Sequence, residues 1–182
     1  MEISEASLLR LLADEKTQRK AFETVVRQYS QPLYCTIRRM VLSHDDADDV
    51  LQNTFLKAWK SLPAFEGKSK FSTWLYRIAV NEALEFLRGS KARNTISEDE
   101  EAGGYIASRL LADDYFDGDD AEARLQEAIH RLPEVQRTVF QLKYCDGMKY
   151  SAISAILGTS EGALKASYHI AVKKISAYLK DV

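Results

Sequence analysis

Basic, aromatic and amide side chains lie close together between Phe65 and Arg88, in the stretch FEGKSKFSTWLYRIAVNEALEFLR. Aromatic rings offer unpaired bases a stacking surface, while lysine and arginine neutralise backbone phosphates. Helical spacing predicts one stripe with four such side chains, Trp74, Arg77, Asn81 and Arg88. A polar loop ahead of the helix adds Lys68, Ser69, Lys70 and then Phe71. The stretch predicts a surface that opens DNA and holds a single strand.

Phe71 and Trp74 also have a plainer interpretation. An aromatic residue at helical spacing is usually buried, so both rings could simply belong to the core. The stretch by itself leaves this alternative open, and the DNA hypothesis depends on the rest of the chain.

A polar ridge is predicted on the preceding helix, between His44 and Leu62, where Asp45 or Asp46 is expected to be the N-cap. Apolar residues at spacings of three and four form one buried face of this helix. The opposite side carries Asp49, Gln52, Asn53 and Lys57. Each of these could be an ordinary solvated residue. Gln52 and Asn53 add no charge for solubility, however, so the set better suits a hydrogen-bonding protein interface.

A helix-turn-helix is predicted near the C-terminus, with a short helix over 151–157 and a long one from 161 to about 180. Gly158 permits the turn, and Ser160 is expected to cap the second helix. The predicted contacts to duplex DNA are Thr159, Ser160, Glu161, Lys165, His169 and Lys173. A solvated helix face is again the alternative.

The fold class expected for the whole chain is all-α, because no useful stretch alternates as a strand would and the three prolines fall at plausible helix boundaries. We expect two small helical domains, over 1–90 and 121–182. Residues 91–120 carry nine acidic side chains and a Gly-Gly pair, which predicts a flexible acidic linker.

The formal net charge of −2 makes the chain a poor free-standing DNA binder, because non-specific affinity comes mostly from cations that displace counterions from phosphates. If DNA is the target, another molecule must supply much of the electrostatic attraction.

Catalytic, metal and nucleotide-binding motifs are missing from the sequence, so we expect neither an enzyme nor a cofactor. No signal peptide and no apolar run of membrane-spanning length is visible. Cys35 and Cys145 match no paired motif and are predicted to be reduced core thiols. A cytoplasmic protein is therefore expected.

Three segments taken in order resemble bacterial RNA polymerase sigma factors of the extracytoplasmic-function group. They are DDADDVLQNTFLKAW, FSTWLYRIAVNEALEFLR and LPEVQRTVFQLKYCDGMKYSAISAILGTSEGALK. The resemblance covers about 17–90 and 121–180, and its specificity lies in the order and separation of the motifs. It implies a sigma region 2 domain and a sigma region 4 domain with no domain between them.

The resemblance also implies roles for the residues named above. The ridge Asp49, Gln52, Asn53 and Lys57 matches the segment that binds the β′ clamp helices of core polymerase. The loop 66–71, with Asn81, resembles the part that captures a base flipped from the −10 element, and Trp74 lies in the segment similar to an aromatic wedge. The linker resembles a segment that threads through the polymerase cleft. Residues 121–144 resemble the part that rests on the β flap, and 160–173 the reader of the −35 element. An anti-sigma partner, often membrane-bound, is implied as well.

The last helix departs from the family pattern, because Ser167, Ile170 and Val172 stand where arginines are frequent. We therefore expect promoter binding to depend less steeply on salt than in a more basic relative. A stand-alone helix-turn-helix regulator remains the alternative function. Such a regulator would have no need for the ridge and the aromatic, basic surface over 45–88.

Overall fold

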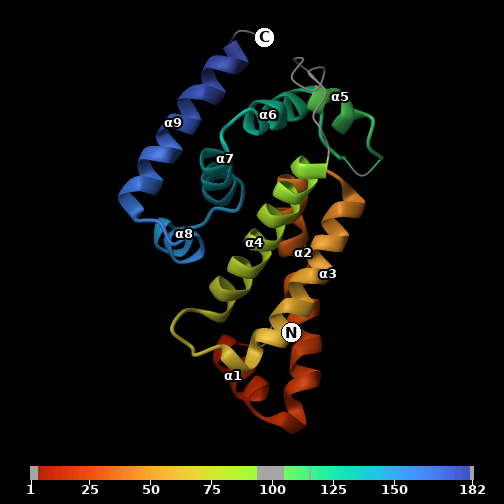
Figure 1. Cartoon of the computed structure of the whole chain (residues 1–182), viewed down its shortest axis with the longest axis vertical. Helices are drawn as coiled ribbons and strands as arrows, with labels where there is room; N and C mark the ends of the chain where they lie inside the picture. Colours follow the sequence, from red (N-terminus) through yellow and green to blue (C-terminus); the bar gives the residue numbers. More distant parts are fainter. Residues whose placement is uncertain (1–3, 94–104, 115, 181–182) are drawn as a thin grey trace. The chain divides into compact units, whose positions relative to one another are not determined.

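The computed structural model describes residues 4–93, 105–114 and 116–180, and every regular element within them is a helix (Figure 1). The chain divides by its internal contacts into two units, Met1–Glu85 and Phe86–Val182. The predicted fold class, all-α with two helical domains, is confirmed. The contact boundary falls inside the fourth helix rather than at residue 90.

The first unit is built from α1 (Glu5–Ala13), α2 (Glu15–Val41), α3 (His44–Ser61) and the larger part of α4 (Phe71–Arg93). Side-chain oxygens cap the first three helices, since Ser4, Asp14 and Ser43 each accept a hydrogen bond from a first-turn N–H. The cap of α3 is therefore Ser43 rather than Asp45 or Asp46. The two aspartates lie in the first turn, where the helix dipole favours a negative charge.

The core of the first unit is made by one apolar stripe from each helix, as the three-and-four spacing predicted. Its buried members include Leu8, Leu12, Val25, Leu33, Ile37, Ala47, Val50, Ala58, Phe71, Leu75, Ala79 and Ala83. The small alanines of α3 and α4 leave little side-chain bulk between helices. Burial of these stripes fixes which sides of α3 and α4 face outward.

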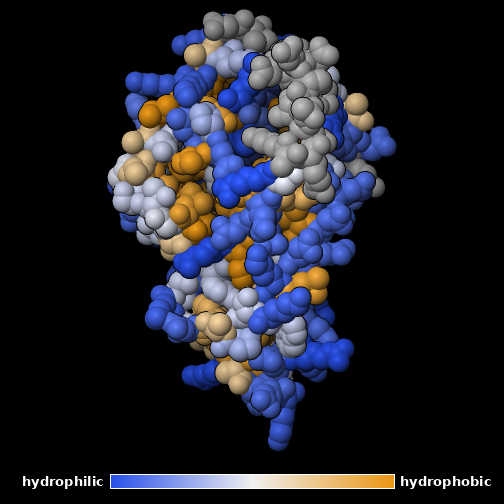
Figure 2. All heavy atoms as spheres, in the orientation of Figure 1, coloured by the Kyte–Doolittle hydropathy of each residue, from blue (hydrophilic) through white to orange (hydrophobic). Residues whose placement is uncertain are grey.

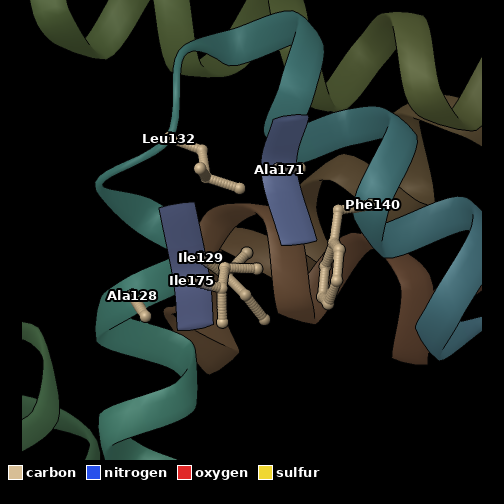
Figure 3. Close-up of a cluster of buried hydrophobic side chains, with 6 residues drawn as sticks. All are labelled: Ala128, Ile129, Leu132, Phe140, Ala171 and Ile175. Atoms are coloured by element: carbon tan, nitrogen blue, oxygen red, sulfur yellow. The ribbon is translucent and has the colours of Figure 1, made fainter. Parts of the chain in front are cut away.

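The second unit contains α5 (Tyr105–Leu111), α6 (Asp120–His130), α7 (Glu134–Phe140), the single π-helical turn η3 (Gln141–Cys145), α8 (Tyr150–Leu157) and α9 (Glu161–Lys180). Figure 3 shows the buried cluster that joins α6, α7 and α9, with Ile129 and Phe140 facing Ala171 and Ile175. This cluster holds α9 so that its opposite side is exposed.

The predicted linker differs from expectation where the structure describes it. Residues 94–104 lie outside the described residues. After them, α5 forms within the predicted linker and packs on α6, burying Ala107 and Leu110. The buried carboxylate of Glu127 accepts a hydrogen bond from the backbone N–H of Ala107 at 3.0 Å. Residues 105–111 are therefore a packed helix and not a free tether. Ala107 and Leu110 are buried although the surrounding sequence is acidic, because α6 offers them an apolar surface.

Cys35 and Cys145 form no disulfide, and both are half-buried, whereas the sequence predicted that they are core thiols.

The predicted helix-turn-helix is present as α8 and α9. Gly158 adopts the left-handed backbone conformation, with φ of 67°, and ends α8. The hydroxyl of Ser160 then accepts a hydrogen bond from the backbone N–H of Ala163 at 3.4 Å. Glycine and serine therefore play the turn and cap roles that the sequence predicts for them.

Gly158→Ala should lower the free energy of unfolding by about 1–2 kcal/mol, because an L-residue in the left-handed region carries that strain. Gly162→Ala is the matched control, since Gly162 lies inside α9 with open space around its Cα. That change should be neutral or stabilising by up to about 1 kcal/mol. Urea unfolding followed by circular dichroism measures both. Equal effects of the two changes would contradict the turn assignment.

Candidate nucleic-acid interface

The predicted stripe on α4 is exposed over most of its length. Arg77 and Asn81 are exposed and Trp74 is half-buried, while Leu75, Ala79 and Ala83 on the other side of the helix are fully buried. The core therefore turns one cation, one amide and one aromatic ring outward along a single face. Arg88 is exposed as well, but it lies in the part of α4 grouped with the second unit.

Trp74 is supported from below by two other aromatic rings. Its ring centroid lies 5.0 Å from that of Phe65 and 5.4 Å from that of Phe71, and Phe65 and Phe71 are themselves edge to face at 5.6 Å. Tyr29 of α2 meets Phe71 edge to face at 6.3 Å. These four rings form the aromatic cluster of the first unit. It holds Trp74 in place while leaving part of its ring accessible.

Phe71 is the residue for which the predicted DNA contact is wrong. Its side chain is 0% exposed, so it has no face to offer to a base. Of the two interpretations of Phe71 and Trp74, burial is correct for Phe71 and only partly correct for Trp74. Spacing could not separate them, because residues three apart share one side of a helix.

The loop before α4 carries its polar side chains at the surface. Lys68 and Lys70 are exposed, and Ser69 is half-buried with its hydroxyl donating to the carbonyl of Lys70 at 3.3 Å. Gly67 takes a φ of 68°, which allows the chain to turn there. Lys68 pairs with Glu66 in its own loop. An exposed pair of this kind contributes little to stability, so a phosphate can replace the carboxylate at small cost.

All four residues of the predicted ridge, Asp49, Gln52, Asn53 and Lys57, are exposed on α3. Lys57 donates a hydrogen bond to Glu82 of α4, and Glu85 lies 3.9 Å from its ammonium. The hydrogen bond to Glu82 and the two negative charges raise the pKa of Lys57, against a smaller effect of desolvation. Lys57 therefore ties α3 to α4 in addition to facing solvent.

An apolar groove that the sequence did not predict runs beside this ridge. It has a volume of about 790 Å³, and its walls come from α2 and α3, with Arg19, Phe22, Glu23, Val26, Gln52, Phe55, Leu56 and Trp59. Leu56 is 57% exposed and Trp59 38%, which is costly for large apolar side chains. The sequence held one signal for this groove: Leu56 lies one turn after Gln52, so helical spacing places an apolar side chain on the same side of α3 as the polar ridge.

On α9, five of the predicted contact residues, Ser160, Glu161, Lys165, His169 and Lys173, are exposed, and Thr159 is half-buried. From Glu161 onward they follow one another at intervals of four, so they share one face of the helix. The ammonium of Lys165 lies 5.7 Å from the ring centroid of Tyr150 on α8, a cation–π contact that limits its range of positions. Hydrophobic side chains reach the surface over α7 and α9 (Figure 2). Tyr144 of η3 and Ile170 of α9 are exposed.

Comparison with known proteins places both surfaces in one family. The family model "Sigma-70 region 2" matches residues 25–93, and "Sigma-70, region 4" matches residues 122–175. The ECF RNA polymerase sigma-E factor of Haemophilus influenzae is 33% identical over 160 residues, which cover 84% of each chain. The chain belongs to the ECF group of sigma factors.

Further relatives of this sigma factor agree with the assignment. The ECF RNA polymerase sigma factor SigW of Bacillus subtilis is 29% identical over 182 residues, covering 95% of this chain and 96% of SigW. Among solved structures, CnrH in complex with the cytosolic domain of CnrY has a TM-score of 0.72 at 24% identity and covers 97% of both chains. The sigma factor RpoE of Bartonella quintana, in complex with the anti-sigma factor NepR, has a TM-score of 0.67 at 22% identity, covering 88% of this chain and 98% of RpoE. These two likenesses support the fold.

Within residues 4–93, 105–114 and 116–180, no helix combines the length and apolar character needed to cross a bilayer. Nor does that part of the chain hold three or more His, Cys, Asp or Glu placed to bind a metal ion.

Phe71→Ala should lower the free energy of unfolding of the first unit by about 3–5 kcal/mol, because it removes a fully buried ring and leaves a cavity. Lys68→Ala, in the exposed loop three residues earlier, should change it by no more than about 0.5 kcal/mol. Urea unfolding of both variants measures the difference. Normal stability of Phe71→Ala together with lost DNA binding would show that the ring is a DNA contact after all.

Proposed function

We propose that this sigma factor is a dissociable specificity subunit of RNA polymerase that binds the core enzyme through α2 and α3 and reads promoter DNA with α4 and α9. The observation that carries the proposal is the pairing of two different exposed surfaces in one chain. One has a supported aromatic ring beside a cation and an amide, as a single strand requires, and the other is a helix-turn-helix, as a duplex requires.

The polymerase-binding surface would combine the ridge Asp49, Gln52, Asn53 and Lys57 with the adjacent groove. Protein interfaces usually place apolar anchors at the centre and hydrogen-bonding groups at the rim. Leu56 and Trp59 supply the anchors, and Gln52 belongs to both the ridge and the groove wall. The resemblance of the ridge to the polymerase-binding segment of sigma factors makes the β′ clamp helices the expected partner. A groove between two helices can accept a helix with an apolar stripe, which is compatible with that partner.

The −10 surface would consist of Lys68, Ser69, Lys70, Trp74, Arg77, Asn81 and Arg88. Extruding a base from a duplex costs a few kcal/mol, and stacking on an aromatic ring returns about 1–3 kcal/mol per base. Trp74 would provide the stack and Asn81 hydrogen bonds to an exposed base edge. The loop lysines and Arg77 would neutralise phosphates. In the role we propose, this chain neither forms nor breaks a covalent bond.

The −35 surface would be the exposed face of α9, with Thr159, Ser160, Glu161, Lys165, His169 and Lys173. A recognition helix contacts base edges with its N-terminal residues, and each good contact is worth about 1–3 kcal/mol. Only Lys165, Lys173, Lys174 and Lys180 bring full positive charge on this helix. Affinity from phosphates is therefore limited, and a shallow salt dependence is expected.

Polymerase would supply what the chain lacks on its own. With a net charge of −2, the chain holds DNA weakly on its own, but two weak contacts on one rigid assembly act at high effective concentration. A contact of α6, α7 and η3 with the β flap would fit two exposed side chains, Val135 of α7 and Tyr144 of η3. An anti-sigma factor is a further expected partner, supported by the NepR complex of a structurally similar sigma factor. An anti-sigma factor would act by covering these same surfaces. The sigma factor itself would act in the cytoplasm.

The reconstituted holoenzyme first selects promoter templates from a random library. Run-off transcription on these templates with purified core polymerase then tests the proposal. Transcripts from defined start sites should require both the chain and the core enzyme. A chain that binds duplex specifically alone and yields no transcript with polymerase would instead be a stand-alone regulator.

Trp74→Ala should reduce open-complex formation by roughly 5- to 150-fold, the loss of one stacked base. Asn81→Ala should reduce it through lost hydrogen bonds to the base edge, and both variants should leave affinity for core polymerase unchanged. Trp74→Phe is the control, since it keeps a stacking ring in the same aromatic cluster. Permanganate footprinting measures opening, and a polymerase pull-down measures binding. Equal loss of opening and binding in Trp74→Ala would point to a folding role.

Leu56→Ala, and the pair Gln52→Ala with Asn53→Ala, should each weaken binding to core polymerase by about 1 kcal/mol or more, roughly fivefold or greater. Lys20→Ala is the control, because Lys20 is exposed on α2 and is absent from the groove walls. Titration of labelled sigma factor with core enzyme measures the affinities. Unchanged affinity in Leu56→Ala and in the pair Gln52→Ala with Asn53→Ala would remove this surface from the proposal.

A further inference from the structure

We infer that α1 is part of the −10 reader, and that Glu5 is a positioning residue that fixes the junction between the loop 66–70 and α4. The inference rests on the proposed function of that loop and helix. It concerns a segment outside the region 2 match, which begins at residue 25.

The N-terminus of α4 needs a hydrogen-bond acceptor from another segment, because its own N-cap residue cannot provide one. The carbonyl of Lys70 accepts the first helical hydrogen bond, from the backbone N–H of Trp74 at 3.0 Å, so Lys70 is the N-cap residue of α4. A lysine side chain has three donors and no acceptor, so it cannot satisfy the free N–H groups of the first turn. The good N-cap residues are Ser, Thr, Asp and Asn, and none of them is at this position.

Glu5 supplies the missing acceptor from a distance of 66 residues in sequence. Its Oε1 accepts a hydrogen bond from the backbone N–H of Phe71 at 2.7 Å, in a partly buried position. The carboxylate also lies at the positive end of the α4 dipole, which favours a negative charge. A charge-assisted bond of this length is among the stronger single contacts available to a backbone N–H.

α1 is held firmly enough to transmit this constraint. Its Leu8 and Leu12 are 0% and 3% exposed, and Ser4 caps its first turn directly before Glu5. Figure 1 draws α1 beside the loop that leads into α4. A hollow of about 290 Å³ separates them, lined by Leu9 and Leu12 on the α1 side and by Leu62, Phe65 and Gly67 on the other. Across this hollow, the Glu5 bond is a direct polar tie between α1 and the start of α4.

The position of this tie gives it a consequence for DNA. Phe71 is held at its ring by the core and at its N–H by Glu5, while Lys68 and Lys70 precede it and Trp74 follows within one turn. A free helix N-terminus would also attract a phosphate. Because Glu5 accepts from the N–H of Phe71, that donor is not offered to a backbone phosphate, and the loop lysines remain for phosphate contacts. Glu5 would thereby set where the strand enters the reader.

Two variants and one matched control test the inference in the full chain and in holoenzyme. Glu5→Ala removes the acceptor, Glu5→Gln keeps a neutral one, and Glu15→Ala removes an exposed glutamate from the same first-turn position of α2. Hydrogen exchange of the peptide spanning 66–74 reports the junction. Permanganate footprinting of holoenzyme on a selected promoter reports opening, and a pull-down reports polymerase binding.

Glu5→Ala should speed exchange in 66–74 by roughly 2- to 30-fold, the fold-change of a lost helix cap, and reduce promoter opening with polymerase binding retained. Glu5→Gln should fall between Glu5→Ala and wild type, and Glu15→Ala should match wild type. Glu5→Ala matching Glu15→Ala in both assays would overturn the inference. So would faster exchange spread evenly over α2 and α3, which would make Glu5 a general stabilising group. If wild-type holoenzyme opens no promoter, the proposed function fails, and the exchange result still decides whether Glu5 positions the junction.

Discussion

Burial of Phe71 at the first position of α4 is the interaction on which the rest of the first unit depends. The ring is fully enclosed, Phe65 and Tyr29 meet its edges, and Trp74 leans against it one turn later. Together with the buried Leu75, Ala79 and Ala83, this ring fixes the rotation of α4 about its own axis, so that Arg77 and Asn81 face outward. A helix rotated by one residue would turn that polar stripe by about 100° toward the core.

A second constraint is electrostatic. The chain has more acidic than basic residues, and some of its exposed lysines are paired with glutamates, as Lys57 is with Glu82 and Lys68 with Glu66. On the function we propose, such a chain would gain specificity from shape, stacking and a small number of hydrogen bonds rather than from bulk charge. Weak non-specific DNA binding suits the dissociable subunit that we propose, since strong non-specific binding would hold it on DNA outside promoters.

Local patterns in the sequence predicted what local physics determines. The all-helical class, the outward stripe of α4, the turn at Gly158 and the cap at Ser160 all follow from spacing and from residue types with known backbone preferences. The features that sequence reasoning missed are non-local. The groove beside Leu56 exists only because α2 packs on α3, α5 forms because α6 offers it a surface, and the Glu5 bond joins segments that are far apart in the chain. Phe71 was misassigned because spacing places a residue on a side of a helix and cannot say how deep that side lies.

The two tryptophans of the chain, Trp59 and Trp74, lie one in each surface of the first unit that we assign, which permits a direct measurement. Sigma factor labelled with 5-fluorotryptophan gives one ¹⁹F resonance for each, assigned with Trp59→Phe and Trp74→Phe. Core polymerase should perturb the Trp59 resonance and leave that of Trp74 close to its free position. Promoter DNA added to the holoenzyme should then perturb Trp74 as the −10 element opens. A Trp74 resonance that stays unchanged in a transcriptionally competent open complex would contradict the account.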